Sequence, residues 1–231
     1  MISASLPPNE SERLKSLHEH NLLDTLPEEV YDDITRLAAE ICGTPFAAIN
    51  LIAEDRQWSK SAHHQEGESL GLHHYLRVPR EYSFCAHAIL NPDETMVVPD
   101  ARYDERFSNN PLTVNDPCIK FYAGVPIKDA EGRAFGSLCV LDSRPRELPE
   151  HKLESLKALA KLVNTHFQLR RTKIELEKTQ QQVDATQPVL RDMMSAIDAL
   201  RTNAEGETAN RLTSLQEGIT SLETIFKVPH E

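Results

Sequence analysis

The apolar run PFAAINLIA at residues 45–53 constrains the fold of this chain more than any other segment. It is short, it begins with a proline, and Glu54 and Asp55 end it. A fully apolar run of this kind is typical of a strand covered on both faces. The segment DRQWSKSA follows at once, which predicts a hairpin partner with a turn at Glu54–Asp55. Residues 45–53 are therefore expected to form a central strand.

The hydrophobic period on either side of this run predicts an α+β fold. Before it, apolar residues recur at helical spacing up to Gly43, with Thr25 as the expected N-cap. After it, short strand-like runs occur at Thr95–Val98, Lys120–Ile127 and Phe135–Leu141, and the turn KDAEGR joins the last two. Strands that arrive mainly as hairpins, with helices at both ends, predict a mostly antiparallel sheet flanked by helices.

The C-terminal third is expected to be helical and to hold two chains together. A helix opens after Pro149 and grows polar beyond residue 168, and Pro188 is expected to restart the chain. Two arms with one apolar stripe each then follow, and two heptads per arm are too few to be stable alone. The expected organisation is a disordered tail at 1–8, a globular domain at 9–168, a linker helix at 169–186 and a helical hairpin at 187–231. A homodimer through residues 169–227 would cover the stripes.

Charge and cysteine usage narrow the classes of function. Residues 151–231 hold 11 Lys/Arg and 11 Asp/Glu, so the net charge of −11 falls on residues 1–150. Such a domain repels phosphate backbones, and no nucleic-acid partner is expected. No apolar run is long enough to cross a membrane, and the start of the chain does not read as a secretory signal. Four cysteines without a CxxC pair favour reduced thiols in the cytoplasm.

Seven stretches between residues 9 and 172 resemble the GAF domains that bacteria fuse to histidine kinases and diguanylate cyclases. They are LLDTLPEEVYDDITRLAAEICGTPFAAINLI, DRQWSKS, SFCAHAIL, VVPDARYDERFSNNPL, IKFYAGVPI, GRAFGSLCVLD and PRELPEHKLESLKALAKLV. The resemblance implies a sheet of five or six strands, with the terminal helices on one face and a small-ligand pocket on the other. The identity of the ligand and of any cofactor stays unknown, because the stretch after Lys60 is longer than the family usually has.

The resemblance places the candidate ligand-binding residues on that second face. Cys85 and His87 fall at an expected helix start after Ser83, where a thiol gains acidity. They are interpreted either as a redox or ligand-attaching pair or as pocket wall. Only one of Phe121 and Tyr122 can face the pocket, because strand residues alternate. The loop at 99–111 brings a cation, two amides and an aromatic ring together, or braces itself through an Asp100–Arg106 pair. The pocket candidates are Phe84, Cys85, His87, Asp100, Arg106, Phe107, Asn109 and Tyr122.

Four imidazoles lie within twelve residues, at His63, His64, His73 and His74. They are weak candidates for a zinc or nickel site, because no cysteine or clustered carboxylate joins them at a regular spacing. The other interpretations of this histidine-rich stretch are a solvated loop and a loop whose conformation depends on pH.

Several activities within the resemblance are weighed against these residues. Bilin attachment uses a cysteine beside a histidine, whereas an alanine separates Cys85 from His87. Reduction of free methionine sulfoxide needs several pocket cysteines, and only Cys85 matches, with Cys118 some way past the second position. Residues 187–227 contain no histidine for autophosphorylation. The hypothesis is a non-catalytic sensor that binds a small ligand or senses redox state and signals to a downstream protein. The alternatives are a sulfoxide reductase-like enzyme and a dimerisation scaffold without a ligand.

Overall fold

The computed structural model describes residues 1–65, 77–202 and 205–226. The chain divides into two compact units, residues 1–171 and 172–231. Within the described residues no helix is long and apolar enough to span a membrane.

The first unit is built on a six-stranded sheet in which every neighbouring pair is antiparallel. The strand order is β3-β2-β1-β6-β5-β4. Strand β1 has all seven residues buried and pairs with β2 and β6, which confirms the predicted central strand. The strands are β1 (Phe46–Ile52), β2 (Arg56–His64), β3 (Arg77–Pro79), β4 (Met96–Val98), β5 (Phe121–Lys128) and β6 (Ala134–Asp142).

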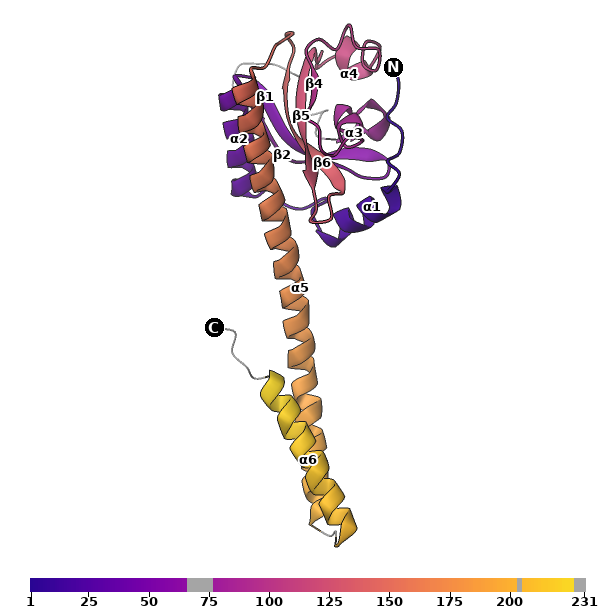
Figure 1. The fold of residues 1–231 in the computed structure, drawn as a ribbon, viewed down its shortest axis with the longest axis vertical. Helices are drawn as coiled ribbons and strands as arrows, with labels where there is room; N and C mark the ends of the chain where they lie inside the picture. The colour runs from indigo at the N-terminus through magenta and orange to yellow at the C-terminus, as the bar shows by residue number, and fades with distance from the viewer. Residues whose placement is uncertain (66–76, 203–204, 227–231) are drawn as a thin grey trace. The chain divides into compact units, whose positions relative to one another are not determined.

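One face of the sheet carries two long helices, α2 (Glu29–Cys42) and α5 (Glu150–Arg201) (Figure 1). Leu156, Ala160, Val163 and Phe167 of α5 are buried in the same core as Ala38 of α2 and the inward side chains of the strands. The spacing of these α5 residues places them on one side of a helix, as the sequence predicts. The first part of α5 is therefore an integral element of the domain core.

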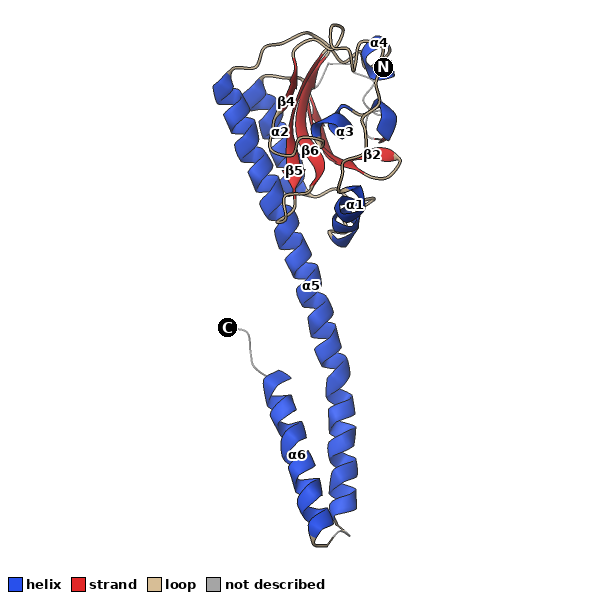
Figure 2. Ribbon diagram, turned by 45° about the vertical axis from the view of Figure 1, so that its right-hand side comes forward, coloured by secondary structure: helices blue, strands red, loops and turns tan. Residues whose placement is uncertain are grey.

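The other face of the sheet carries two short helices and a long loop (Figure 2). These are α3 (Phe84–Ala88), α4 (Pro111–Val114) and the loop at residues 99–110, and their buried side chains form a second core. Ser83 caps α3 by accepting a hydrogen bond from Ala86 N, and Asn110 caps α4 through Leu112 N. This layer holds most of the candidate site residues.

Helix α1 (Glu10–Glu19) is fixed to the turn between β1 and β2 by a cluster of charges. Arg13 is fully buried, donates to Ile52 O at 2.6 Å and pairs with Glu10. Arg80 pairs with the same carboxylate and donates to Ala53 O. Glu10 thus joins two cations that each hold a carbonyl of the turn, and we call these three side chains the Glu10 clasp.

Four local expectations differ from the structure. Helix α2 begins at Glu29 rather than after Thr25, because the Thr25 hydroxyl donates to Leu22 O instead of capping the helix. Strand β3 is absent from the predicted strands. Residues 1–8, expected to be a disordered tail, contact the domain: Ile2 N donates to Arg106 O, and Ala4 packs on the second core. Helix α5 passes through Pro188 without a break.

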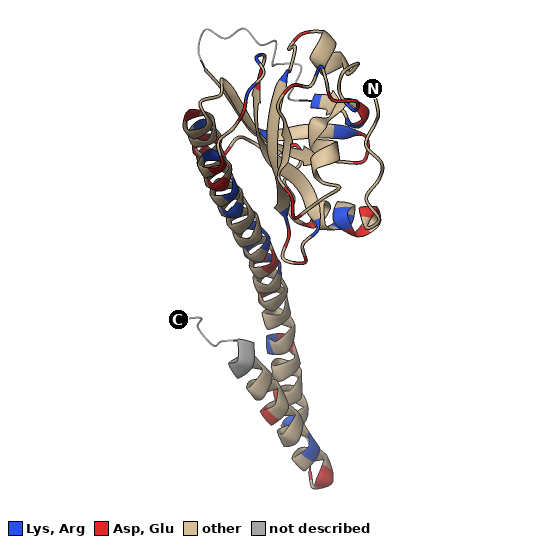
Figure 3. Ribbon diagram, turned by 45° about the horizontal axis from the view of Figure 1, so that its top comes forward, with Lys and Arg blue, Asp and Glu red and all other residues tan. Residues whose placement is uncertain are grey.

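The second unit contains the distal part of α5 and helix α6 (Glu207–Phe226). Leu190, Ile197 and Ile219 are buried between the two helices, with Met194 and Leu212 beside them. This packing agrees with a helical hairpin whose arms each carry an apolar stripe. Lys/Arg and Asp/Glu both occur along α5, with a run of basic residues between Glu154 and Glu175 (Figure 3).

Candidate functional site

Three aromatic rings predicted to line a pocket stack on one another beneath α3. The Phe84 and Phe107 rings lie 3.9 Å apart at 9°, and Phe84 lies 5.4 Å from Tyr122. All three side chains are fully buried. The His87 ring meets Phe107 edge-on, and the Arg106 guanidinium lies over the Phe107 ring at 4.9 Å from its centroid. These candidate residues therefore contact one another and build the second core.

A polar cluster lies under the stack, on the central strands. Asn50 Nδ2 donates to Cys85 Sγ at 3.3 Å and to Cys139 Sγ at 3.4 Å. The two sulfurs lie 3.9 Å apart, and the Tyr122 hydroxyl donates to Cys85 Sγ at 3.4 Å. Ser59 donates to Asn50 Oδ1 and fixes the amide. All four cysteines of the chain are free thiols in the structure.

The surroundings of the two thiols shift their pKa values in opposite directions. Burial raises the pKa of Cys85, but its hydrogen-bonding contacts with Cys139, Ser137, Tyr122 and Asn50 outweigh burial, so the pKa falls below that of an ordinary thiol. Burial raises the pKa of Cys139 well above its usual range, and the neighbouring Cys85 raises it further. Cys85 is accordingly the member of the pair that is stabilised as a thiolate.

The loop at 99–110 braces itself, but through different pairs from the one considered in the sequence. Asp100 pairs with Arg102, and Arg106 pairs with Asp104, each at 2.7 Å. The hydrogen bonds from Arg106 lower the pKa of Asp104 and those from Arg102 lower the pKa of Asp100. Asn109 is exposed, so it lies away from the aromatic stack. Asp100 and Arg106 do not contact one another in the pairs the structure describes, because a partner two residues away satisfies each.

His87 contacts the N-terminal segment. Its Nε2 lies 3.0 Å from Ile2 O, on the side of α3 next to Phe107. Burial lowers the pKa of His87, and the bond to Ile2 opposes this effect only in part. A neutral imidazole that donates to a carbonyl fits this contact.

The histidine cluster is only partly within the described residues. His63 and His64 end strand β2, and burial followed by the charge of His64 lowers the pKa of His63. His73 and His74 lie outside the described residues. Among the described residues no group of three or more His, Cys, Asp and Glu side chains is placed to hold a metal ion. The weak metal prediction thus stays untested for the whole cluster.

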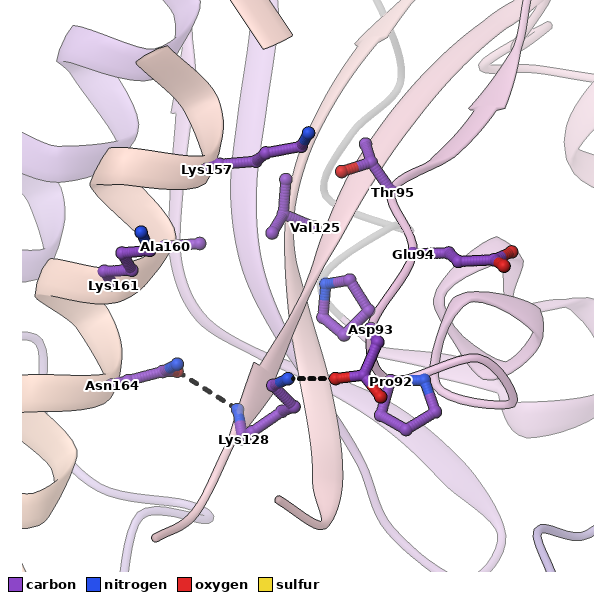
Figure 4. A pocket seen from close by; sticks show the side chains of 11 residues that line it. Pro92, Asp93, Glu94, Thr95, Val125, Lys128, Lys157, Ala160, Lys161 and Asn164 are labelled. Carbon is purple, nitrogen blue, oxygen red and sulfur yellow. Dashed lines mark hydrogen bonds and ion pairs between the residues drawn. The ribbon is translucent and has the colours of Figure 1, made fainter. Parts of the chain in front are cut away.

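A cavity of about 160 Å³ lies on the opposite side of the sheet, between the β4–β5 edge and α5. Lys157 reaches from α5 toward Thr95, and Lys128 pairs with Asp93 across its floor (Figure 4). Asn164 of α5 accepts a hydrogen bond from Lys128 N. Three lysines and two acids line the cavity, and two of the lysines are already paired, Lys128 with Asp93 and Lys157 with Glu154.

The GAF domain family model matches residues 26–167. This match covers more than half of the chain and the whole of the six-stranded sheet, so the chain belongs to the GAF domain family. The recognition made from sequence and the predicted fold class are both confirmed.

Similar proteins are known from sequence and from structure. The cyclic di-GMP phosphodiesterase PA2567 of Pseudomonas aeruginosa is 37% identical over 164 residues, which is 71% of this chain and 26% of that protein. The chain thus spans about a quarter of that relative. The bacteriophytochrome RpBphP3 of R. palustris aligns over 89% of this chain and 46% of its own, with a TM-score of 0.54 and 15% identity. The GAF domain of an Acinetobacter phosphoenolpyruvate-protein phosphotransferase aligns over 71% and 96%, with a TM-score of 0.49 and 16% identity.

Sequence reasoning missed the polar half of the site. Cys139 was not singled out, and neither were Asn50 on β1, Ser59 on β2 and Ser137 on β6. Asn50 pairs with Ser59 and with Ser137 in the strand register. A signal did exist: Asn50 and Ser137 are polar residues inside otherwise apolar runs, and buried polar groups need partners.

Proposed function

We propose that this chain is a non-catalytic sensor domain of a signalling protein. A stimulus at the α3 face, either a small ligand or an oxidation, alters the packing of the sheet. Helix α5 carries that change to a dimeric helical segment, where a downstream signalling protein reads it. The setting we propose is the cytoplasm, where thiols are kept reduced.

The observation that carries this proposal is that α5 contributes buried residues to both compact units of the chain. Its first turns are buried in the domain core through Leu156, Val163 and Phe167. The same helix continues to Arg201 and is packed there by α6. A helix that contributes residues to two packed units gives a change in one unit a route to the other.

The surface of α5 supports a second copy of this chain as the partner. Leu162, Leu169 and Leu176 are spaced seven residues apart and are 50%, 60% and 57% exposed. Val183, Leu190 and Ile197 continue the same spacing, and α6 covers the last two. A sustained seven-residue repeat is typical of a helix that pairs with another helix along a narrow seam. Residues 151–231 are also neutral in charge, so the helical segments of two copies carry no net charge that would keep them apart.

The relatives support a signalling role and leave the activity open. PA2567 is named for cyclic di-GMP hydrolysis, and this chain spans 26% of its length. The hydrolytic activity is therefore a property of that protein. For this chain we propose regulation only, and the family membership agrees with a sensory domain.

Sedimentation of the full chain tests the dimer. We expect a particle of twice 26.1 kDa for the wild type at micromolar concentration. Leu169→Glu and Leu176→Glu should each yield a monomer, because a charge in the seam loses its water without a partner. Leu26→Glu, at a side chain that is 83% exposed outside the seam, is the matched control and should stay dimeric. A wild type that sediments at 26.1 kDa would contradict the proposal.

A dimerisation scaffold without a stimulus is the second candidate, because the aromatic side chains at the α3 face already fill the space around one another. Native mass spectrometry separates the two functions. Extra mass that disappears on denaturation would identify a bound ligand and support the sensor. A bare dimer whose helices respond to no ligand and no oxidant would favour the scaffold.

A further inference from the structure

Cys85 and Cys139 come from different layers of the domain and meet in its interior. Cys85 lies on α3 and Cys139 on β6, and 54 residues separate them in the chain. Both side chains are fully buried, and their sulfurs are 3.9 Å apart. A disulfide needs about 2.05 Å between sulfurs, so a shift of about 1 Å by each would suffice.

The site holds the two sulfurs in place with directed contacts. A single amide nitrogen, Asn50 Nδ2, donates to both of them. Tyr122 donates to Cys85, and Cys139 donates to Ala48 O at 3.6 Å. A pair that packed only by size would need none of these polar partners, which are costly to bury.

We propose that Cys85 and Cys139 form a reversible intramolecular disulfide when a small hydroperoxide, such as hydrogen peroxide, enters the domain. This deepens the proposed function, on which its signalling consequence rests, by naming the stimulus. Because the Cys139 thiol lies beside Cys85, it can react with the sulfenic acid of Cys85 before a second oxidant molecule arrives.

The chemistry balances in two steps. The Cys85 thiolate attacks one peroxide oxygen, the O–O bond breaks, and Cys85 becomes a sulfenic acid while hydroxide takes a proton and leaves as water. Cys139 then attacks the Cys85 sulfur, the S–O bond breaks, and a second water carries away the Cys139 proton. The two sulfurs together lose two electrons and the peroxide gains them. A dithiol reductant reverses the change.

The consequence for the domain follows from where Cys85 lies. Its neighbour Phe84 stacks on Phe107 and Tyr122, so a pull of α3 toward β6 disturbs the whole aromatic stack. Cys139 lies on β6, where Leu138 and Val140 on either side of it face the α5 side. A disulfide between Cys85 and Cys139 would therefore join α3, on one face of the sheet, to a strand that also packs against α5 on the other face.

Peptide mapping of the full chain tests the bond directly. Reduced protein is treated with hydrogen peroxide, free thiols are blocked with N-ethylmaleimide in denaturant, and trypsin is added without reductant. Each cysteine then lies on its own peptide, at residues 37–56, 81–102, 107–120 and 134–146. We expect peptides 81–102 and 134–146 to be linked, and dithiothreitol to separate them.

The controls distinguish a built pair from random oxidation. Cys85→Ser and Cys139→Ser should abolish the link, and Cys118→Ser, at a partly exposed thiol, should keep it. Cys139→Ala replaces Cys139→Ser if the latter does not fold. Glutathione disulfide, which is too large for the interior, should leave both thiols free over the same time.

Two results would overturn the inference. One is maleimide on both Cys85 and Cys139 after peroxide has consumed Cys118. The other is an equally fast link with glutathione disulfide, which would mean that the thiols react from an opened chain. Neither result affects the sedimentation test, so failure of the disulfide and failure of the dimer are separate outcomes.

Discussion

At the scale of single residues, two glycines make room for the thiol site. A Cβ on Gly124 would lie 2.1 Å from the Tyr122 hydroxyl, and a Cβ on Gly136 would lie 2.2 Å from Asn50 O. Both contacts are far too short for real atoms. The strands therefore carry glycine where the tyrosine and the strand backbone of Asn50 approach most closely.

We expect Gly136→Ala to lower the free energy of unfolding by about 3 kcal/mol, because the backbone of β1 has to move. Gly124→Ala should cost less, about 1–2 kcal/mol, since a tyrosine ring can turn away. Trp58 is the only tryptophan and lies on β2, so its fluorescence in urea reports this unit alone.

Gly218→Ala is the matched control, because nothing lies within 4 Å of its added Cβ. It should leave the Trp58 transition unchanged. Equal stability of all three variants would mean that the two close approaches do not shape the site.

Prediction from sequence named only part of the candidate site at this scale. The aromatic residues Phe84, Phe107 and Tyr122 were named as candidates because the family resemblance marks the stretches that contain them. Asn50 and Cys139 were not, because their role depends on which strands are neighbours. The short turn between β1 and β2 indicates that these two strands pair, but nothing in the sequence indicates that β6 lies on the other side of β1.

At the scale of elements, the Glu10 clasp joins α1 to the β1–β2 turn. Burial raises the pKa of Glu10, but hydrogen bonds from Arg13 and Arg80 outweigh it and lower the pKa from 4.5 to about 2. A carboxyl whose pKa is lower in the folded protein stabilises it fully above the unfolded value. That contribution is lost as the pH falls from about 4.5 toward about 2.

Glu10→Gln should therefore destabilise the domain by about 2 kcal/mol at pH 7 and by much less near pH 3. Urea unfolding at both pH values measures the difference. Glu12→Gln, at an exposed position of the same helix, should have no effect at either. A Glu10→Gln deficit that does not shrink in acid would show that the clasp is not ionic.

Elements were predictable where their signal is long. The apolar run of β1 and the helical periodicity of α2 are strong patterns. Strand β1 lies where the sequence placed it, and α2 ends with Gly43 as its C-cap, as predicted, although it begins only at Glu29. Strand β3 has three residues and ends in a proline, which leaves no period to detect. The prediction that Pro188 breaks the helix was wrong. Proline removes one backbone hydrogen bond of α5, but the helix continues, and Leu190 and Ile197 beyond it pack on α6.

At the scale of the whole molecule, α5 is the element on which the account depends. It contributes buried residues to the domain and a seven-residue repeat to the proposed dimer. The same helix therefore has two surfaces with different periods, one that packs on the sheet and one that we propose packs on a second copy. A change in the first is expected to alter the second.

Hydrogen exchange along α5 tests this claim most directly. Wild-type protein is compared in its reduced form and after peroxide treatment, once peptide mapping has verified the Cys85–Cys139 link. Cys139→Ser receives the same treatment as the control. The account predicts that amide exchange in residues 172–201 changes on oxidation in the wild type and stays constant in the variant. Identical exchange in reduced and linked wild type would contradict transmission through α5.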